Sequence, residues 1–315
     1  MGIKVACIGA GTVGSSWAAL FAWRGCRVVV YDPFPEALRK AEENIARTVT
    51  TLSEIFLDGK AGVDEVLRRV TYTESLEEAL SGTQYVQESA VEKLEVKRSL
   101  FEEMDNIADP ETVLATSTSG LSITEIQKAA KKHPERCITA HPYNPPHLIP
   151  LVEVVPGELT SKRCIDRTVE FMDWLGKKPI VVKKDVPGMV ANRLAAALWR
   201  EAVNLVYQGI ATPEEIDIAV KYGPGIRWAI TGVYLTYHLG GGAGGMKYFL
   251  EFFKDHYKRL WSDLACWSEY PDNSFEAILK SMEDYKVIKR MAYDELTKWR
   301  DEQLAKILKL LIEGG

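Results

Sequence analysis

A glycine-rich segment, Gly9-Ala10-Gly11-Thr12-Val13-Gly14, constrains the fold of this 315-residue chain more than any other feature. It directly follows the strand-like run 4–8 and precedes an apolar, helix-like run over 15–23. A GxGxxG in that context lets the backbone turn tightly and approach a pyrophosphate, whose charge the helix N-terminus stabilises. The second strand-like run ends at Asp32, roughly 20 residues further on, where a carboxylate hydrogen-bonds the adenine ribose and repels a 2'-phosphate. We therefore expect NAD to bind at Gly9, Gly11, Gly14 and Asp32; an ordinary glycine turn with a capping Asp32 is the alternative.

Short β-branched runs alternate with helix-length segments through the first 180 residues. The expected strands cover 4–8, 27–31, 84–87, 113–116, 137–140, 151–155 and 180–182. The expected helices between them include 35–52, 91–104, 122–132 and 161–175. This alternation predicts an α/β fold in which residues 1–186 form a Rossmann-type, doubly wound parallel sheet with helices on both faces.

The pattern changes after Pro187-Gly188, because long periodic segments then follow one another without strand-like runs. We expect residues 187–315 to form an all-helical second domain. Its helices should cover 189–208, a segment from Thr212, 246–264, 275–285 and a terminal stretch ending near 312. The Thr212-Pro213-Glu214-Glu215 sequence combines an N-cap, a first-turn proline and a capping-box glutamate.

Composition limits the partners of this chain. It contains 46% hydrophobic and 26% charged residues with a net charge of -5, so it lacks the basic excess that grips phosphate backbones, and we expect no nucleic-acid partner. Its apolar runs fall well short of the roughly 20 residues of a membrane helix. Its five cysteines are scattered without a CxxC, and its five histidines form no HxxxH. We expect no membrane partner, no metal, reduced thiols and, without a signal-peptide pattern, a cytoplasmic location.

Two side chains of the predicted sheet indicate acid–base chemistry. His141 follows the strand 137–140, and ligands of such sheets bind beyond the carboxyl ends of the strands. Glu153 shares a strand face with Leu151 and Val155, an apolar setting in which a carboxylate needs a partner such as His141. The pair suits alcohol oxidation, with His141 taking the hydroxyl proton and Glu153 orienting the ring. An ordinary loop histidine and an exposed edge glutamate are the alternatives.

Ser119 and Asn192 are candidate donors to the substrate oxygen. Ser119 lies in the turn after the strand 113–116, at the same sheet edge. Asn192 shares a helical face with apolar residues at 189, 196, 199 and 203, so we expect its amide to be buried and hydrogen-bonded. Both could stabilise developing alkoxide character. A turn serine and a structural asparagine are the alternatives.

With these residues in place, the chain resembles the L-3-hydroxyacyl-CoA dehydrogenase superfamily. The matching motifs are GAGTVG at 9–14, VQESAVEKLEVK at 86–97, TSTSGLSI at 116–123, HPYNPP at 141–146, LVEVV at 151–155 and PGMVANRL at 187–194. The superfamily's catalytic set falls on the candidates named above, Ser119, His141, Glu153 and Asn192. The resemblance further implies a homodimer formed by the helical domain, and nicotinamide-side or cofactor contacts at Glu92, Lys97 and Asn144.

Within the superfamily, HPYNPPHLIPLVEVV is more similar to the branch of L-carnitine dehydrogenase and L-gulonate 3-dehydrogenase (lambda-crystallin) than to the acyl-CoA branch, whose motif typically reads HFFNP. Arg227 stands where the acyl-CoA enzymes usually lack an arginine, and it could clamp a free carboxylate unless it forms an ordinary ion pair. Several aromatic residues could cage a trimethylammonium group or simply pack in a core or interface. They are Trp228, Tyr234, Tyr237, Trp261 and Trp267. The glycine-rich run 240–245 should connect two helices.

These expectations imply an NAD-dependent oxidoreductase that oxidises the 3-hydroxyl of a small L-3-hydroxy acid, of the L-carnitine or L-gulonate type, to the 3-keto acid. An (S)-3-hydroxyacyl-CoA dehydrogenase of fatty-acid metabolism would share the catalytic set; Arg227 argues against it, and Lys60 is a candidate contact for a CoA tail. A structural, crystallin-like or NAD-sensing protein is the alternative of another class. A buried carboxylate beside a histidine argues against that alternative.

Overall fold

The computed structural model describes residues 2–55 and 62–313, so Lys60 lies outside the described residues. The chain forms two compact units, Met1–Arg193 and Leu194–Gly315. The first unit contains the sheet, and the second is helical over its described part, 194–313, in which no strand occurs. In the described part of the chain, no helix is both long enough and apolar enough to span a membrane.

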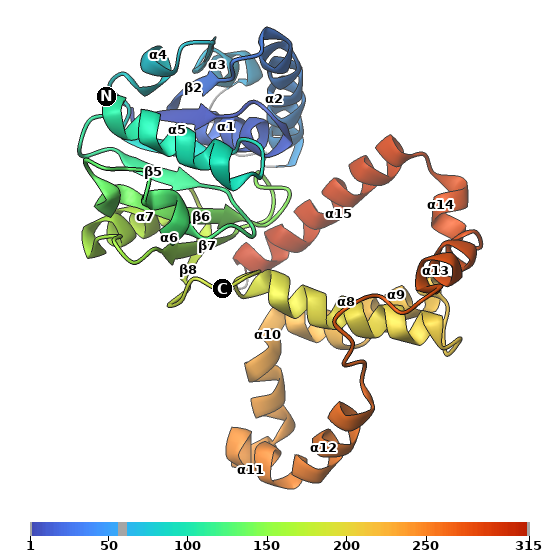
Figure 1. The fold of residues 1–315 in the computed structure, drawn as a ribbon. Helices are drawn as coiled ribbons and strands as arrows, with labels where there is room; N and C mark the ends of the chain where they lie inside the picture. The colour runs from blue at the N-terminus through green and yellow to red at the C-terminus, as the bar shows by residue number, and fades with distance from the viewer. Residues whose placement is uncertain (1, 56–61, 314–315) are drawn as a thin grey trace. The chain divides into compact units, whose positions relative to one another are not determined.

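An eight-stranded sheet forms the middle layer of the first unit (Figure 1). Its spatial order is β3-β2-β1-β4-β5-β6-β7-β8, and only the β6–β7 pair is antiparallel. The strands are β1 (Lys4–Ile8), β2 (Arg27–Tyr31), β3 (Val70–Thr73), β4 (Tyr85–Glu88), β5 (Val113–Thr116), β6 (Cys137–Pro142), β7 (Leu151–Pro156) and β8 (Lys178–Val181). The expected doubly wound, mostly parallel sheet is confirmed. The edge strand β3 was not predicted, because its four residues alternate too briefly to stand out as a pattern.

Helices pack on both faces of this sheet, and the two-residue period of the strands divides the core accordingly. In β1, Val5 and Cys7 belong to one apolar cluster and Ala6 and Ile8 to the other. The first cluster includes residues of α1 (Thr12–Trp23), α2 (Pro35–Ile55), α3 (Val63–Leu67) and α7 (Lys162–Trp174). The second includes residues of α4 (Leu76–Leu80), α5 (Leu94–Ile107) and α6 (Ile123–Gln127). A single 3-10 turn, Pro134–Arg136, precedes β6.

The strand order reverses between β1 and β4, the two strands from which the chain winds outward in opposite directions. In open sheets of this kind, a crevice for ligands opens beyond the carboxyl ends of the strands at the reversal. The glycine loop follows β1, the segment 89–93 follows β4, and the segment 117–122 follows β5. The fold thus brings the candidate residues of three separate sequence regions to one edge of the sheet.

The second unit consists of helices, as expected. They are α8 (Ala191–Tyr207), which begins in the first unit, and then α9 (Pro213–Tyr222), α10 (Pro224–Gly240), α11 (Gly245–Phe252), α12 (Lys254–Asp263), α13 (Ser274–Met282), α14 (Lys286–Arg290) and α15 (Tyr293–Glu313). The capping box at Thr212 and Glu215 is formed at the start of α9. The glycine run connects α10 to α11, as predicted, through the 3-10 turn Gly242–Gly244.

One helix expectation in this unit was wrong, and one long helix was missed. The helix expected over 246–264 is divided at Phe253 into α11 and α12. The helix α10 was not predicted, because Pro224, Gly225, Gly232 and Gly240 lower the helical signal of its sequence. At Gly232 the backbone is non-helical, with φ 67 and ψ -175, so α10 consists of two helical segments joined at a kink.

Candidate active site

The glycine loop after β1 has the geometry of a dinucleotide-binding turn. Gly9 has φ +100, and a Cβ there would lie 2.8 Å from the Ser89 backbone, so only glycine fits. A Cβ at Gly14 would lie 1.9 Å from the Gly9 carbonyl oxygen, because α1 packs directly on the turn. A Cβ at Gly11 would have no neighbour within 4 Å, so the space beside this N-cap residue of α1 is open. The loop therefore fits a pyrophosphate brought against the first-turn amides of α1.

Asp32 lies at the end of β2 and is half-buried. Its Oδ2 accepts a 2.9 Å hydrogen bond from the Ala10 N–H, inside the glycine loop, and its Oδ1 accepts one of 3.1 Å from the Phe34 N–H. The carboxylate therefore joins the loop to β2 and also caps the turn that follows. Each carboxylate oxygen has a second lone pair for a ribose hydroxyl, so the two roles are compatible.

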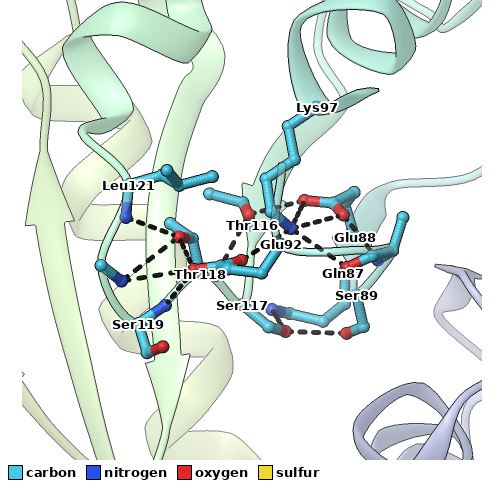
Figure 2. A network of polar contacts seen from close by, with 12 residues as sticks. Gln87, Glu88, Ser89, Glu92, Lys97, Thr116, Ser117, Thr118, Ser119 and Leu121 are labelled. Atoms are coloured by element: carbon cyan, nitrogen blue, oxygen red, sulfur yellow. Dashed lines mark hydrogen bonds and ion pairs between the residues drawn. The ribbon is translucent and has the colours of Figure 1, made fainter. Parts of the chain in front are cut away.

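A buried ion pair lies at the carboxyl end of β4 (Figure 2). Glu88 and Lys97, from β4 and α5, are 0% and 1% exposed, and the Lys97 ammonium lies 2.8 and 3.0 Å from the two Glu88 oxygens. The Ala90 N–H and the Thr116 hydroxyl each donate a 2.6 Å hydrogen bond to the same carboxylate. Sequence reasoning missed Glu88. The signal was available, because a glutamate within a strand buried on both faces needs a partner, as Glu153 does.

Glu92 extends this network to the loop that carries Ser119 (Figure 2). One Glu92 oxygen lies 3.4 Å from the Lys97 ammonium. The other accepts from the Thr118 hydroxyl at 2.5 Å, the Ser119 N–H at 3.1 Å and the Gly120 N–H at 3.3 Å. Burial by itself raises the pKa of Glu92, but these hydrogen bonds and the Lys97 charge outweigh it and hold the pKa below its ordinary value. The ionised Glu92 thus shapes the turn from which the exposed Ser119 side chain projects.

Gln87 is a second buried polar residue that sequence reasoning missed. Its amide nitrogen donates to the Ser117 hydroxyl at 2.7 Å and to the Ala140 carbonyl at 3.1 Å. Its oxygen accepts from the Tyr85 hydroxyl at 3.0 Å. The side chain thereby joins the loop after β5 to the residue that directly precedes His141 in β6.

His141 and Glu153 form the pair that the sequence indicates. They are directly opposed in the antiparallel β6–β7 pair, and the His141 Nδ1 lies 2.9 Å from a Glu153 oxygen. The side chains are 7% and 0% exposed. Since an ionised carboxylate only accepts hydrogen bonds, the proton of this bond belongs to Nδ1, and a neutral His141 carries its lone pair on Nε2. The exposed-edge alternative for Glu153 is excluded, because β8 covers the outer side of β7.

The start of α8 completes the environment of Glu153. The second Glu153 oxygen accepts from the Val190 N–H at 2.8 Å and the Ala191 N–H at 3.0 Å. Burial alone raises the pKa of Glu153, but the hydrogen bond from His141 and those from Ala191 and Val190 outweigh it and lower the pKa below its ordinary value. The carboxylate is therefore ionised at neutral pH and aligns the imidazole.

Asn192 departs from its expected environment. It lies in the first turn of α8 and is half-buried, not fully buried. Met189 and Val203 on its face are buried, but Ala196 is exposed and Trp199 is 54% exposed, so the predicted apolar face is not covered along its length. Asn144 is exposed in the loop after β6, next to a cis peptide bond to Pro145.

Arg227 and several of the predicted cage aromatics belong to the second unit. Arg227 is exposed on α10, and its charge acts to lower the pKa of Tyr257, although burial and the Tyr237 hydroxyl raise it to about 12. The Tyr257 ring lies 6.1 Å from that of Tyr237 and 5.4 Å from that of Trp261, whereas Trp267 packs on Tyr270 at 5.9 Å. The structure therefore groups two of the five predicted aromatics around Tyr257 and places Trp267 in another contact.

The described residues contain no cluster of three or more His, Cys, Asp or Glu side chains that could hold a metal ion. All five cysteines, each within the described ranges, are free, and four of them are buried. Burial raises the pKa of the Cys26 and Cys164 thiols to about 12, so these groups are unreactive thiols in the core.

Comparison with known proteins matches both parts of the chain to domain families. Residues 4–186 match the 3-hydroxyacyl-CoA dehydrogenase NAD binding domain, and residues 188–281 match the 3-hydroxyacyl-CoA dehydrogenase C-terminal domain. The L-carnitine dehydrogenase of Oceanobacillus iheyensis is 39% identical over 98% of each chain. That of Streptomyces coelicolor is 39% identical over 97% of this chain and 94% of its own.

Solved structures are also similar. The crystal structure of 5-formyl-3-hydroxy-2-methylpyridine 4-carboxylic acid 5-dehydrogenase, an NAD+-dependent dismutase, has a TM-score of 0.82 at 30% identity and covers 99% of both chains. The 3-hydroxybutyryl-CoA dehydrogenase of Escherichia coli has a TM-score of 0.65 at 29% identity, over 83% of this chain and 53% of its own.

Proposed function

This chain belongs to the 3-hydroxyacyl-CoA dehydrogenase family, and from that membership we propose that it is an NAD-dependent dehydrogenase of a small L-3-hydroxy acid, with L-carnitine as the leading substrate. The observation that carries the proposal is the buried His141–Glu153 pair at the edge of a dinucleotide-binding sheet. The identity of 39% to two enzymes named L-carnitine dehydrogenase supports carnitine before other hydroxy acids.

The residues at the end of β1 and β2 fit the cofactor. The space beside Gly11 and the close packing at Gly14 suit a pyrophosphate at the N-terminus of α1. Asp32 favours NAD over NADP, because its carboxylate would repel a 2'-phosphate. NAD supplies the hydride acceptor of the reaction when it is bound. We assign the nicotinamide side of its site to Glu92 and Asn144. Lys97 is 1% exposed and paired with Glu88, so we assign it the role of supporting Glu92 from behind.

The chain's own residues then perform the proton chemistry. We propose that His141 is the general base, with Nε2 accepting the proton of the substrate 3-hydroxyl. The ionised Glu153 holds the Nδ1–H tautomer and stabilises the imidazolium that forms. The Ser119 hydroxyl and the Asn192 amide would donate hydrogen bonds to the substrate oxygen as negative charge develops on it.

We assign the free carboxylate of the substrate to Arg227. An exposed guanidinium can bind a carboxylate through two parallel N–H donors, whereas the thioester of an acyl-CoA offers no such charge. This assignment distinguishes a hydroxy-acid dehydrogenase from an (S)-3-hydroxyacyl-CoA dehydrogenase with the same catalytic set.

The test is NADH formation, which is followed by the absorbance of NADH. The protein is mixed with NAD and, in separate assays, with L-carnitine, L-gulonate or L-3-hydroxybutyryl-CoA. We expect turnover with a free acid and a preference for L-carnitine. Turnover with the thioester alone would remove the role of Arg227 and place the enzyme with the acyl-CoA dehydrogenases. NADH binding without turnover of any 3-hydroxy acid would support an NAD-sensing or structural protein instead.

We also propose a cytoplasmic homodimer. Large apolar side chains on the second unit support an interface there, since Tyr234, Phe252 and Trp261 are 82%, 64% and 70% exposed. The free, scattered cysteines support a reducing compartment. Sedimentation at micromolar concentration tests the dimer, which a monomer under those conditions would contradict.

A further inference from the structure

Lys177 is a buried lysine that the proposed reaction does not use. It lies in the turn between α7 and β8 and is 4% exposed. Its ammonium donates to the carbonyl oxygen of Pro146 and, at 2.7 Å, to that of Ile149. It also lies 5.2 Å from the centre of the Trp17 ring. Burial lowers the pKa of Lys177 to about 7, and no charged neighbour contributes to that shift.

Burying an ammonium without a carboxylate is unfavourable, so the contacts of Lys177 indicate what it does for the structure. Both acceptors belong to the loop of residues 143–150, which joins His141 in β6 to Glu153 in β7. The Leu148 and Ile149 N–H groups each bond to the Pro145 carbonyl at 3.0 Å, which folds this loop into a compact turn. Lys177 satisfies two further carbonyls of that turn, those of Pro146 and Ile149.

A second contact joins the same loop to α1. The Ser16 hydroxyl accepts a 3.0 Å hydrogen bond from the His147 N–H and forms a second one, of 2.8 Å, with the His147 Nδ1. Ser16 and Trp17 are consecutive, buried residues of α1. The loop 143–150 is therefore held to two adjacent positions of the helix that begins at the glycine turn, through His147 at Ser16 and through Lys177 at Trp17.

We propose that Lys177 is a positioning residue that, together with the Ser16–His147 contact, holds the loop 143–150 in a fixed position against α1. The loop starts two residues after His141, and α1 presents the first-turn amides to the cofactor. These two contacts, which we call the joint, thus set the distance between the dinucleotide-binding turn and the chain segment that carries His141 and Asn144. This inference takes from the proposed function only that NAD is the cofactor bound at the turn. Its consequence is that the protein binds NAD(H) more tightly than it would without these contacts.

The test uses Lys177→Met, which keeps the length of the aliphatic stem and removes the donors, with Lys178→Met as the matched control. Lys178 is the adjacent lysine and is exposed at the start of β8. In the protein without cofactor, and below pH 7 where Lys177 is charged, we expect K177M to raise hydrogen exchange at His147, Leu148 and Ile149 on the order of tenfold, because two charge-assisted hydrogen bonds are lost. We expect the Kd for NADH, measured by fluorescence, to rise by a similar factor. K178M should change neither quantity.

A lysine with a purely structural role would behave differently. It would lower the midpoint of thermal unfolding in K177M while loop exchange, relative to the rest of the sheet, and NADH affinity stayed at wild-type values; that result would overturn the proposal. If K177M does not fold, Ser16→Ala removes the second contact by deleting one hydroxyl. Faster exchange at His147 and weaker NADH binding in S16A would support the joint, and unchanged values would overturn it.

These readouts separate the inference from the proposed substrate. Neither the exchange rates nor the NADH affinity requires turnover, so failure to oxidise L-carnitine leaves both measurements valid. If the protein binds no NADH at all, the proposed function fails. The exchange measurement then still decides whether Lys177 holds the loop.

Discussion

Replacing Glu153 with glutamine provides the sharpest test of the proton chemistry, because the change keeps the shape of the side chain and removes its charge. Glu153 is fully buried and accepts three hydrogen bonds, from His141 Nδ1, Val190 N and Ala191 N. The glutamine oxygen can still accept from both backbone N–H groups. Its NH2 group then faces His141 and can only donate, so Nδ1 must become the acceptor and the proton moves to Nε2.

The expected magnitude follows from this change of tautomer. With its proton on Nε2, His141 cannot accept the substrate proton, and the imidazolium loses its buried counter-charge. General-base catalysis contributes roughly 100- to 10,000-fold, so we expect kcat of E153Q to fall by that order. Hydrogen bonds to a charged group contribute about 1.5–3 kcal/mol, so we expect the free energy of unfolding at neutral pH to fall by about 2 kcal/mol.

The pH dependence of stability provides a second observable. The pKa of Glu153 is lowered in the folded protein, so its charge stabilises the fold above the ordinary pKa of about 4.3, and this stabilisation is lost as the pH falls through the folded-state value. E153Q should lack that acid-dependent loss. Denaturant unfolding across acidic pH measures it.

The assay combines NADH formation, NADH binding and denaturant unfolding, with Glu158→Gln as the control. Glu158 follows β7 and its side chain is exposed, so E158Q should match the wild type in all three measurements. E153Q should bind NADH normally. A kcat within threefold of the wild-type value would refute the argument, because His141 would then not depend on a charged partner.

Three further outcomes follow from the same geometry. His141→Ala should abolish turnover and leave NADH binding largely intact. Loss of NADH binding together with activity would instead indicate a structural role. Gly14→Ala should unfold the protein or lower its thermal midpoint strongly, because its Cβ would lie 1.9 Å from the Gly9 oxygen. Gly11→Ala should keep the thermal midpoint and weaken NADH binding, because the space beside Gly11 is open. Equal effects of the two substitutions would contradict this reasoning. Arg227→Met should raise KM for L-carnitine roughly 10- to 100-fold, because a charge-assisted contact is lost, and should leave NADH affinity unchanged. An unaltered KM would show that Arg227 does not bind the substrate.

Local patterns in the sequence were sufficient for most of the secondary structure. The strand β1 with its GxGxxG turn, and the capping box at Thr212, are specified by residues within a few positions of one another. Backbone preferences and side-chain caps act over that range, so they can be read without the fold. The same locality explains the errors at β3 and α10, where a short edge strand and several glycines give weak local signals.

In the candidate site, too, local signals were readable from the sequence and long-range contacts were not. The apolar neighbours of Glu153 showed that it needs a partner, and the strand end before His141 showed where a ligand group could lie. That the two residues are direct partners depends on the antiparallel register of β6 and β7, which no local pattern contains. Asn192 shows the limit of the reasoning, because a helical period identifies the face a residue shares but not whether another element covers that face.

The sequence by itself determined that this chain folds into a dinucleotide-binding sheet followed by helices, and it identified His141 as a candidate partner for Glu153. The tertiary structure alone decided that Glu88 accepts from Lys97, that Gln87 reaches the carbonyl before His141, and that Lys177 donates to two carbonyls of the loop 143–150. The conformational preferences of the backbone are local, so they can be read from the sequence. The partner of a buried charge depends instead on the packing of segments far apart in the sequence, because a buried charge without a partner is costly.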